Sequence, residues 1–305
     1  MNQEEILFDN RTATESLELI KDIGLRKILK NFGERVEQIS DGNTLAFNVM
    51  FRGLRHYKIF RYWLEESRKI PNYDAANPEH QRQRDKLMLE RFAKESNENY
   101  EQALRYVQEF RKEDELFRNI SYQNSLNSLV NIWTSFESSV KEVWIYCVNS
   151  YPKIFIHEIL KHGDTTEITS GKNISFSLLA KYNFNISNLV GQILQWKFDF
   201  TSVNGIKKAF LALLNQNNIS LQKFDDPFLI QLEIARHLVV HNVGIIDQEY
   251  LKRTIKQNEK IGELINFSAE EMRNYGNSCI VPIVELVKEL DKRVNAPEND
   301  LNKGE

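Results

Sequence analysis

Apolar residues recur at three- and four-residue intervals along most of this chain, which is the spacing of one face of an α-helix. The first third predicts helices at about 14–38 and 44–70, and a loop that contains Pro71 follows them. Asn77 then caps a charged segment at 78–117. Because no proline or glycine follows within that segment, we predict a single long amphipathic helix there.

A second helical block begins near Tyr122 with a broad apolar face that ends at Tyr151. A short helix follows, to about Lys161. The polar stretch at 163–175 predicts a loop or a small hairpin. Shorter helices are predicted after it, at about 175–182, 187–197 and 202–215.

The last two predicted helices carry clear start signals. Asp226 is an N-cap directly before a proline, and the helix that it begins runs to about Asn242, where Gly244 stops it. Ser268–Glu271 forms a capping box, which begins a final helix that reaches about Val294.

These patterns predict an all-α protein with at most a small hairpin near 163–175. We expect an N-terminal module of long helices at 1–118, which serves sensing, partner binding or dimerisation. A second helical domain is expected at 119–295, and a flexible tail at 296–305.

Composition supports a folded globular protein, since 41% of the residues are hydrophobic and 27% are charged. The net charge of −3 supplies no global basic field, so any contact with RNA must come from a local groove. Cys147 and Cys279 are far apart in apolar surroundings, which predicts two inert core thiols in a reducing compartment. No apolar run approaches the roughly 18 residues of a membrane span. We therefore expect a cytoplasmic protein without membrane contact.

The segment with the clearest chemistry runs from Glu233 to Gly244 and contains Arg236, His237 and His241. Arginine offers a permanently charged planar fork that matches phosphate oxygens, and histidine titrates near neutral pH. Five residues along a helix separate Arg236 from His241 by about 7.5 Å and about 140°. Because the helix ends there, we expect both side chains to converge on one phosphate. An RNA 2′-hydroxyl is a built-in nucleophile, so transesterification at this site needs no metal.

This segment resembles the signature of the HEPN family (higher eukaryotes and prokaryotes nucleotide-binding). The signature is an arginine followed by a polar residue, a few further residues and then a histidine. Here Arg236, His237 and His241 match it, with a spacing at the short end of the pattern. The segment Asn242–Asp247 also looks like the sequence that follows the histidine in bacterial members. Phe136 and Glu137 are similar to the family's first core helix, where an acidic residue often faces the motif. The resemblance covers about residues 120–293.

The resemblance implies a HEPN-like helical bundle that forms a homodimer, with two motifs across one cleft. It also implies a metal-independent endoribonuclease that uses no cofactor, in a toxin–antitoxin or anti-phage defence system with an antitoxin or defence protein as partner. It assigns His241 as general acid/base, Arg236 as the group that stabilises the scissile phosphate, and His237 as a residue that orients the phosphate or binds RNA. Asn242 and Glu137 are supporting residues. Val243 stands where some family toxins have a modified tyrosine, so we expect no such modification.

Other interpretations of these residues remain open. The same helical fold can act as a non-catalytic module that binds RNA, a nucleotide or a protein. His237 and His241 have the spacing of a zinc pair, but no third ligand is evident nearby. The basic residues Lys252, Arg253 and Lys256 either line the cleft and bind RNA or are simply solvated. The basic, aromatic segment 52–63 is either an RNA-binding surface or a helix with a basic exposed face and an aromatic core face. The sequence contains no phosphate-binding glycine loop, nucleophile elbow or cofactor fingerprint.

Overall fold

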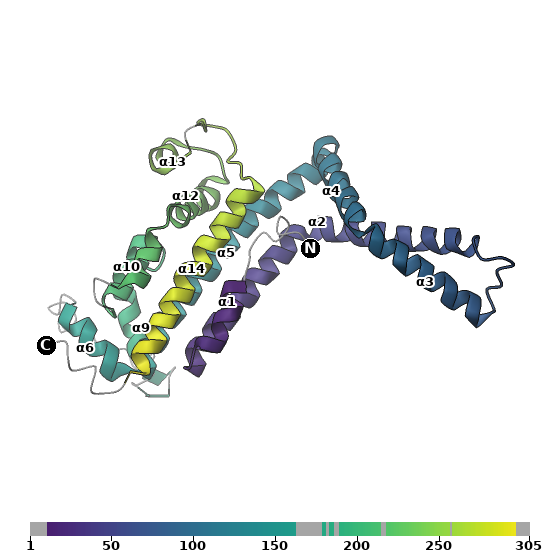
Figure 1. Cartoon of the computed structure of the whole chain (residues 1–305). Helices are drawn as coiled ribbons and strands as arrows, with labels where there is room; N and C mark the ends of the chain where they lie inside the picture. The colour runs from purple at the N-terminus through teal and green to yellow at the C-terminus, as the bar shows by residue number, and fades with distance from the viewer. Residues whose placement is uncertain are drawn as a thin grey trace. The chain divides into compact units, whose positions relative to one another are not determined.

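The computed structural model describes residues 11–162, 179–180, 183–185, 189–214, 218–256 and 258–296. Helices make up the regular structure of these residues, and none of them forms a named strand. The fold is therefore all-α, as predicted (Figure 1). None of the described helices is both long enough and apolar enough to cross a membrane.

The chain divides into two compact units. The inserted unit consists of residues 41–125, and the core unit consists of residues 1–40 together with 126–305. Two helices cross the division, because α2 (Ile23–Ser67) and α5 (Glu115–Ser150) each have one part in each unit.

The N-terminal segment belongs to the core unit, although the sequence predicted it in one module with the residues up to 118. Leu25, Leu29 and Phe32 on α2 are fully buried. The buried carboxylate of Asp291 accepts hydrogen bonds from the backbone N–H groups of Lys21 (3.0 Å) and Asp22 (2.7 Å). The predicted N-terminal module is thus divided between the two units, and its residues 11–40 belong to the core unit with the C-terminal helices.

The core unit is built around α5 and the last helix, α14 (Ala269–Val294). Besides the first part of α2, the described helical elements of this unit are α1 (Arg11–Ser16), η1 (Leu17–Leu19), α6 (Pro152–His162), α9 (Val190–Leu194), η3 (Gln195–Lys197), α10 (Val203–Leu211), α11 (Ile219–Gln222), η4 (Lys223–Asp225), α12 (Pro227–Asn242) and α13 (Gln248–Arg253). Contacts join α14 to α1, α11 and α12.

Large aromatic side chains of α5 form much of the core. Trp133, Phe136 and Trp144 are fully buried, and the Phe136 ring lies 6.1 Å from that of Phe224. The Trp144 indole N–H donates to the carbonyl of Ala209 over 2.9 Å. Burial of three such side chains, with the indole N–H of Trp144 bonded to α10, fixes α5 as the central helix of the unit.

The predicted helix starts of α12 and α14 are confirmed. The Asp226 carboxylate accepts from the N–H of Phe228 over 2.8 Å, and a proline occupies the first helical position. Ser268 and Glu271 form both hydrogen bonds of a capping box. Helix α14 continues through Pro282, which lacks the N–H that would otherwise bind the carbonyl of Ser278.

Several predicted boundaries are wrong. The helices expected at 14–38 and 44–70 are not separate, because α2 runs without a break from Ile23 to Ser67 and passes through Gly42. The start of the first predicted helix instead falls in α1 and η1. Of the shorter helices, 187–197 is α9 followed by η3, and 202–215 is α10, which ends at Leu211. Most of the predicted helix at 175–182, the predicted hairpin near 163–175 and most of the predicted tail lie outside the described residues.

The inserted unit also differs from the prediction, since the expected helix at 78–117 is broken. It consists of α3 (Pro78–Lys94) and α4 (Ser96–Glu113), and α5 begins at Glu115. Glu95 lies at the break, and its carboxylate accepts hydrogen bonds from Tyr62 and from Arg91, the latter over 2.9 Å. A tertiary network, rather than a glycine or a proline, therefore holds the chain where α3 ends.

Candidate functional site

The candidate site lies at the C-terminal end of α12, where the backbone turns sharply. Val243 adopts the left-handed conformation with φ 54°, and its N–H donates to the carbonyl of Leu238. Gly244 follows with φ 78°, and its N–H approaches the same carbonyl at 3.3 Å. The predicted stop is thus a two-residue left-handed turn, in which Val243 comes before the glycine.

The chain beyond this turn is held by backbone hydrogen bonds to the segment before α14. The N–H of Ile246 donates to the carbonyl of Glu263 over 2.9 Å, and that of Ile265 donates to Gly244 over 2.8 Å. The Asn242 side-chain amide donates to the carbonyl of Ile245 over 2.6 Å. Asn242 therefore stabilises the turn that follows His241. Its support of the catalytic residues stays a prediction.

The two histidines of the motif lie side by side on the surface. His237 and His241 are both exposed, and their ring centroids are 4.4 Å apart with an angle of 46° between the ring planes. They are one helical turn apart, so they share a face of α12. The structure therefore brings these two predicted residues together.

Arg236 lies on a different side of the helix from His241, about 140° around the axis. It is half-buried, and its Nε is buried without a hydrogen-bond partner. Among the described residues, no hydrogen bond or ion pair joins Arg236 to either histidine. The expected convergence of Arg236 and His241 is not a contact within this chain, and a bound phosphate would have to bridge them.

Glu137 has a partner of its own on α5. Its carboxylate accepts from the indole N–H of Trp133 over 3.0 Å, one turn away on the same helix. Glu137 is half-buried, and within the described part of the chain it makes no hydrogen bond to α12. Its observed contact is with the aromatic core rather than with the motif.

The three predicted RNA-binding cations differ in their surroundings. Lys252 is exposed on α13. Arg253 pairs with Glu233 over 3.2 Å. Lys256 pairs with Glu271 over 2.7 Å, lies 4.9 Å from the centroid of the Phe267 ring, and donates to the carbonyl of Asn266. Lys256 thus ties the segment after α13 to the start of α14, whereas Lys252 and Arg253 are exposed.

Glu233 is a positioning residue to which the sequence assigned no role. One carboxylate oxygen accepts from the backbone N–H of Val203 over 2.7 Å, at the first turn of α10, and the other pairs with Arg253. Glu233 precedes His237 by one turn of α12. This one-turn spacing from the motif is the feature of the sequence that could have identified Glu233. In the structure Glu233 holds α10 and α13 against α12, the helix that carries the motif.

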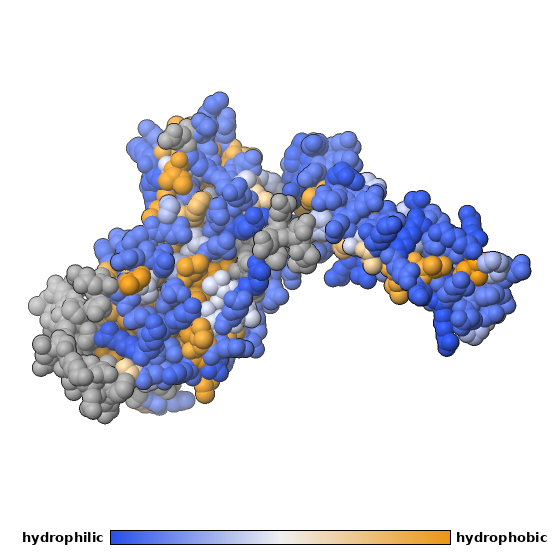
Figure 2. All heavy atoms as spheres, viewed as in Figure 1, coloured by the Kyte–Doolittle hydropathy of each residue, from blue (hydrophilic) through white to orange (hydrophobic). Residues whose placement is uncertain are grey.

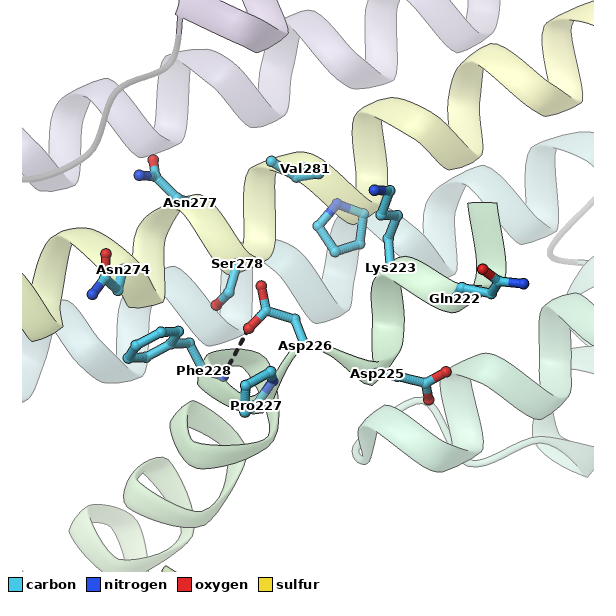
Figure 3. A pocket seen from close by; sticks show the side chains of 11 residues that line it. Gln222, Lys223, Asp225, Asp226, Pro227, Phe228, Asn274, Asn277, Ser278 and Val281 are labelled. Carbon is cyan, nitrogen blue, oxygen red and sulfur yellow. Dashed lines mark hydrogen bonds between the residues drawn. The ribbon is translucent and has the colours of Figure 1, made fainter. Parts of the chain in front are cut away.

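A cavity of about 540 Å³ opens at the other end of α12 (Figure 3). Its lining includes Lys223, Asp226 and Phe228 from η4 and the start of α12, and Asn274 and Asn277 from α14. The position of Asp226 is 15 residues before His241, which corresponds to about 22 Å along the helix axis. The cavity and the motif are therefore separate features.

Other site chemistry is limited in the part of the chain that the structure describes. No group of three or more His, Cys, Asp or Glu side chains is arranged to hold a metal there. Cys147 and Cys279 are fully buried, as predicted, and burial raises the pKa of both thiols. Both thiols therefore stay protonated and unreactive in the folded protein.

Comparison with protein-family models, with curated proteins and with solved structures finds no match for this chain. The resemblance to the HEPN family consequently rests on the motif residues themselves.

Proposed function

We propose that this protein is a metal-independent endoribonuclease of the HEPN type, acting as a homodimer. The observation that carries the proposal is the exposed imidazole pair of His237 and His241 near the end of α12. Arg236 lies on another side of the same helix end, is half-buried, and has an unpaired Nε. These residues offer a proton-transfer group and a phosphate-binding group that a bound phosphate would have to bridge.

The proposed reaction is an intramolecular transesterification of RNA. The 2′-oxygen attacks the adjacent phosphorus while an imidazole accepts the 2′-hydroxyl proton. The bond between phosphorus and the 5′-oxygen breaks, and a protonated imidazole supplies the proton that this oxygen needs. The products are a 2′,3′-cyclic phosphate and a free 5′-hydroxyl. In a homodimer with the motifs facing one cleft, the two copies of His241 supply the base and the acid.

Arg236 is proposed to stabilise the negative charge that grows on the phosphoryl oxygens. Its partial burial lowers the local dielectric constant, which strengthens an ion pair with phosphate. The unpaired Nε gives the guanidinium a donor that no described protein group uses. His237 is proposed to orient the same phosphate from the exposed face.

Single alanine substitutions test the proposal on a short unstructured RNA. Arg236→Ala and His241→Ala are each expected to slow cleavage by about 10²–10⁴-fold, since each removes a group that acts in the transition state. Arg82→Ala removes an exposed cation of α3, outside the segment 52–63 and far from the motif in sequence, and serves as the control. A substrate with a 2′-deoxy sugar at the cleavage position must remain intact.

Two outcomes would reject this function. If both variants stay folded by circular dichroism and cleave as fast as the wild type, the motif is not catalytic. If the wild type binds the RNA but never cuts it, the alternative of a non-catalytic binding module is selected. The proposed setting, a toxin or defence protein with a partner that restrains it, further predicts that expression of the wild type slows growth of the host and expression of the His241→Ala variant does not.

A further inference from the structure

Helix α2 carries an unusual row of exposed apolar side chains in the inserted unit. Leu45, Val49, Tyr57, Phe60 and Leu64 are each between 37% and 60% exposed. Each is four, eight, three or four residues after the one before it. These spacings place all five within an arc of about 120° on one face of the helix. We call this row the α2 ridge. It extends for about 29 Å along the helix.

The core of the inserted unit lies on the opposite side of α2. Tyr62 and Leu54 are buried, and Phe47 and Phe51 pack against the ring of Tyr100 on α4. Most of the ridge therefore lies outside this packing, although the Phe60 ring stacks on that of Trp63, one turn along the same helix. Hydrophobic side chains are also visible among the hydrophilic surface of this unit in Figure 2. An exposed apolar row of this length is a feature of surfaces that bind another molecule.

One glycine, Gly53, interrupts the ridge, and a second, Gly42, stands just before its first residue. Gly42 and Gly53 share its helical face, and a Cβ added at either would meet no atom within 4 Å. Glycine is a poor helix former, and packing inside this protein does not require it at these positions. A glycine in the middle of an apolar row leaves a notch through which the backbone of a second helix can approach closely.

The charged side chains that border the ridge within residues 42–64 are both arginines. Arg52 lies at one edge and Arg61 at the other, whereas Arg55 and Lys58 lie on the side of α2 that faces the core. Arg55 lies over the Phe92 ring, and Arg61 pairs with Glu65 just beyond the segment. Arg52 and His56 are exposed along one edge of the ridge. The surface is therefore complementary to a partner with acidic residues.

We infer that the α2 ridge binds an amphipathic α-helix of another protein, with acidic residues beside its apolar stripe. The apolar row, the notch at Gly53 and the basic edge each match one feature of such a helix. A second copy of this chain fits less well, because two ridges would bring like charges together. RNA fits less well too, since Leu45, Val49 and Leu64 offer no surface on which bases stack.

Two designed helical peptides, each about four heptads long, test the inference with the full chain. Both carry the same leucine stripe, one between glutamates and the other between lysines. We expect the glutamate peptide to bind, as measured by fluorescence anisotropy, and the lysine peptide to bind at least about tenfold more weakly. Added salt should weaken the glutamate peptide's binding.

Variants connect binding to the ridge. Gly53→Leu fills the notch and is expected to weaken the binding of the glutamate peptide by about tenfold or more. Because leucine favours the helix more than glycine does, this variant should be at least as stable as the wild type. Phe60→Glu should weaken it similarly. Leu116→Glu, at an exposed apolar residue of α5 in the same unit, is the matched control and should leave the affinity unchanged.

Three results would overturn the inference. The first is no binding of the glutamate peptide, and the second is equal binding of the two peptides. The third has two parts: single-stranded RNA or anionic lipid vesicles displace the glutamate peptide, and the Phe60→Glu variant binds that competitor more weakly than the wild type does. The ridge would then bind the competitor rather than a helix. None of these measurements uses RNA cleavage, so they remain informative whether or not the proposed ribonuclease activity is found.

Discussion

The imidazole rings of His237 and His241 lie with their centroids 4.4 Å apart on an exposed face of α12. Two nitrogens at this spacing can bind zinc, but a stable site needs three or four protein ligands. No third ligand is arranged beside them among the described residues. We therefore predict that EDTA leaves RNA cleavage unchanged and that added zinc inhibits it by occupying both imidazoles. Cleavage that stops in EDTA and returns with a metal would contradict the metal-independent mechanism.

The attachment of the N-terminal segment to α14 is the second point to test. Asp291→Ala removes the carboxylate that accepts from the backbone N–H groups of Lys21 and Asp22. We expect the free energy of unfolding to fall by about 1.5–3 kcal/mol, because buried donors lose a charged acceptor. Glu285→Ala on the same helix removes only a surface ion pair with Lys288 and should cost under about 1 kcal/mol. Urea unfolding measures both, and equal costs would show that Asp291 does not hold this segment.

Acid should weaken the inserted unit through the carboxylates around Arg91. A hydrogen bond from Arg61 lowers the pKa of Glu65 below the ordinary 4.5, and one from Lys69 does the same for Glu66. A hydrogen bond from Tyr62 lowers the pKa of Glu95. Arg91 contributes to all three shifts. A carboxylate whose pKa is lower in the folded state stabilises the fold above its unfolded pKa. This stability is lost as the pH falls from about 4.5 through the folded values.

The Arg91→Met variant isolates this effect from carboxylates elsewhere in the chain. We expect it to be less stable than the wild type at pH 7 and to lose less stability on acidification, because the three glutamates then titrate closer to their ordinary pKa. Thermal melts at a series of pH values measure the difference. Parallel pH profiles for the two proteins would show that the cluster contributes no pH-dependent stability.

The helix starts could be predicted because their determinants are local. Asp226 bonds to an N–H two residues away, and Ser268 bonds to one three residues away, so a short stretch of sequence contains the whole motif. The break at Glu95 could not be predicted in this way. It is held by Tyr62, which is 33 residues away in sequence, and a stretch without glycine or proline gave no sign of it.

The same distinction applies to the candidate site. The proximity of His237 and His241 follows from their spacing on one helix. The bond from Val203 to Glu233 depends on the packing of α10 against α12, which the spacing along α12 does not encode. Asp291 and Lys21 are 270 residues apart, so the inclusion of the N-terminal segment in the core unit was equally hidden.

The cap of α12 gives a fourth prediction. Asp226→Ala should lower the free energy of unfolding by about 0.5–2 kcal/mol, since the N–H of Phe228 loses its acceptor, whereas Asp226→Asn should retain most of the stability. Asp225→Ala is the neighbouring control, because Asp225 forms an ion pair with Lys207 and is largely exposed. Chemical denaturation compares the three. An alanine variant as stable as the asparagine variant would show that the cap contributes nothing.

The strained turn after His241 gives the last prediction. Val243 has φ 54° and is 68% exposed, so its side chain contributes little packing while its backbone adopts a conformation that L-residues avoid at a cost of about 1–2 kcal/mol. Asparagine tolerates this conformation, so Val243→Asn should raise the free energy of unfolding by about 1 kcal/mol. Val243→Gly relieves the same strain, but its gain is smaller by about 0.5–1 kcal/mol because glycine has more freedom in the unfolded chain.

Val240→Asn is the matched control, since Val240 is also exposed but lies inside α12, where asparagine gives no such gain. Because the Val243→Asn variant keeps the backbone N–H that donates to the carbonyl of Leu238, the turn and the position of His241 should persist. RNA cleavage by Val243→Asn should therefore equal that of the wild type. Urea unfolding measures the free energy of unfolding of both variants. Equal values for Val243→Asn and Val240→Asn would show that Val243 is not held in the left-handed conformation in solution.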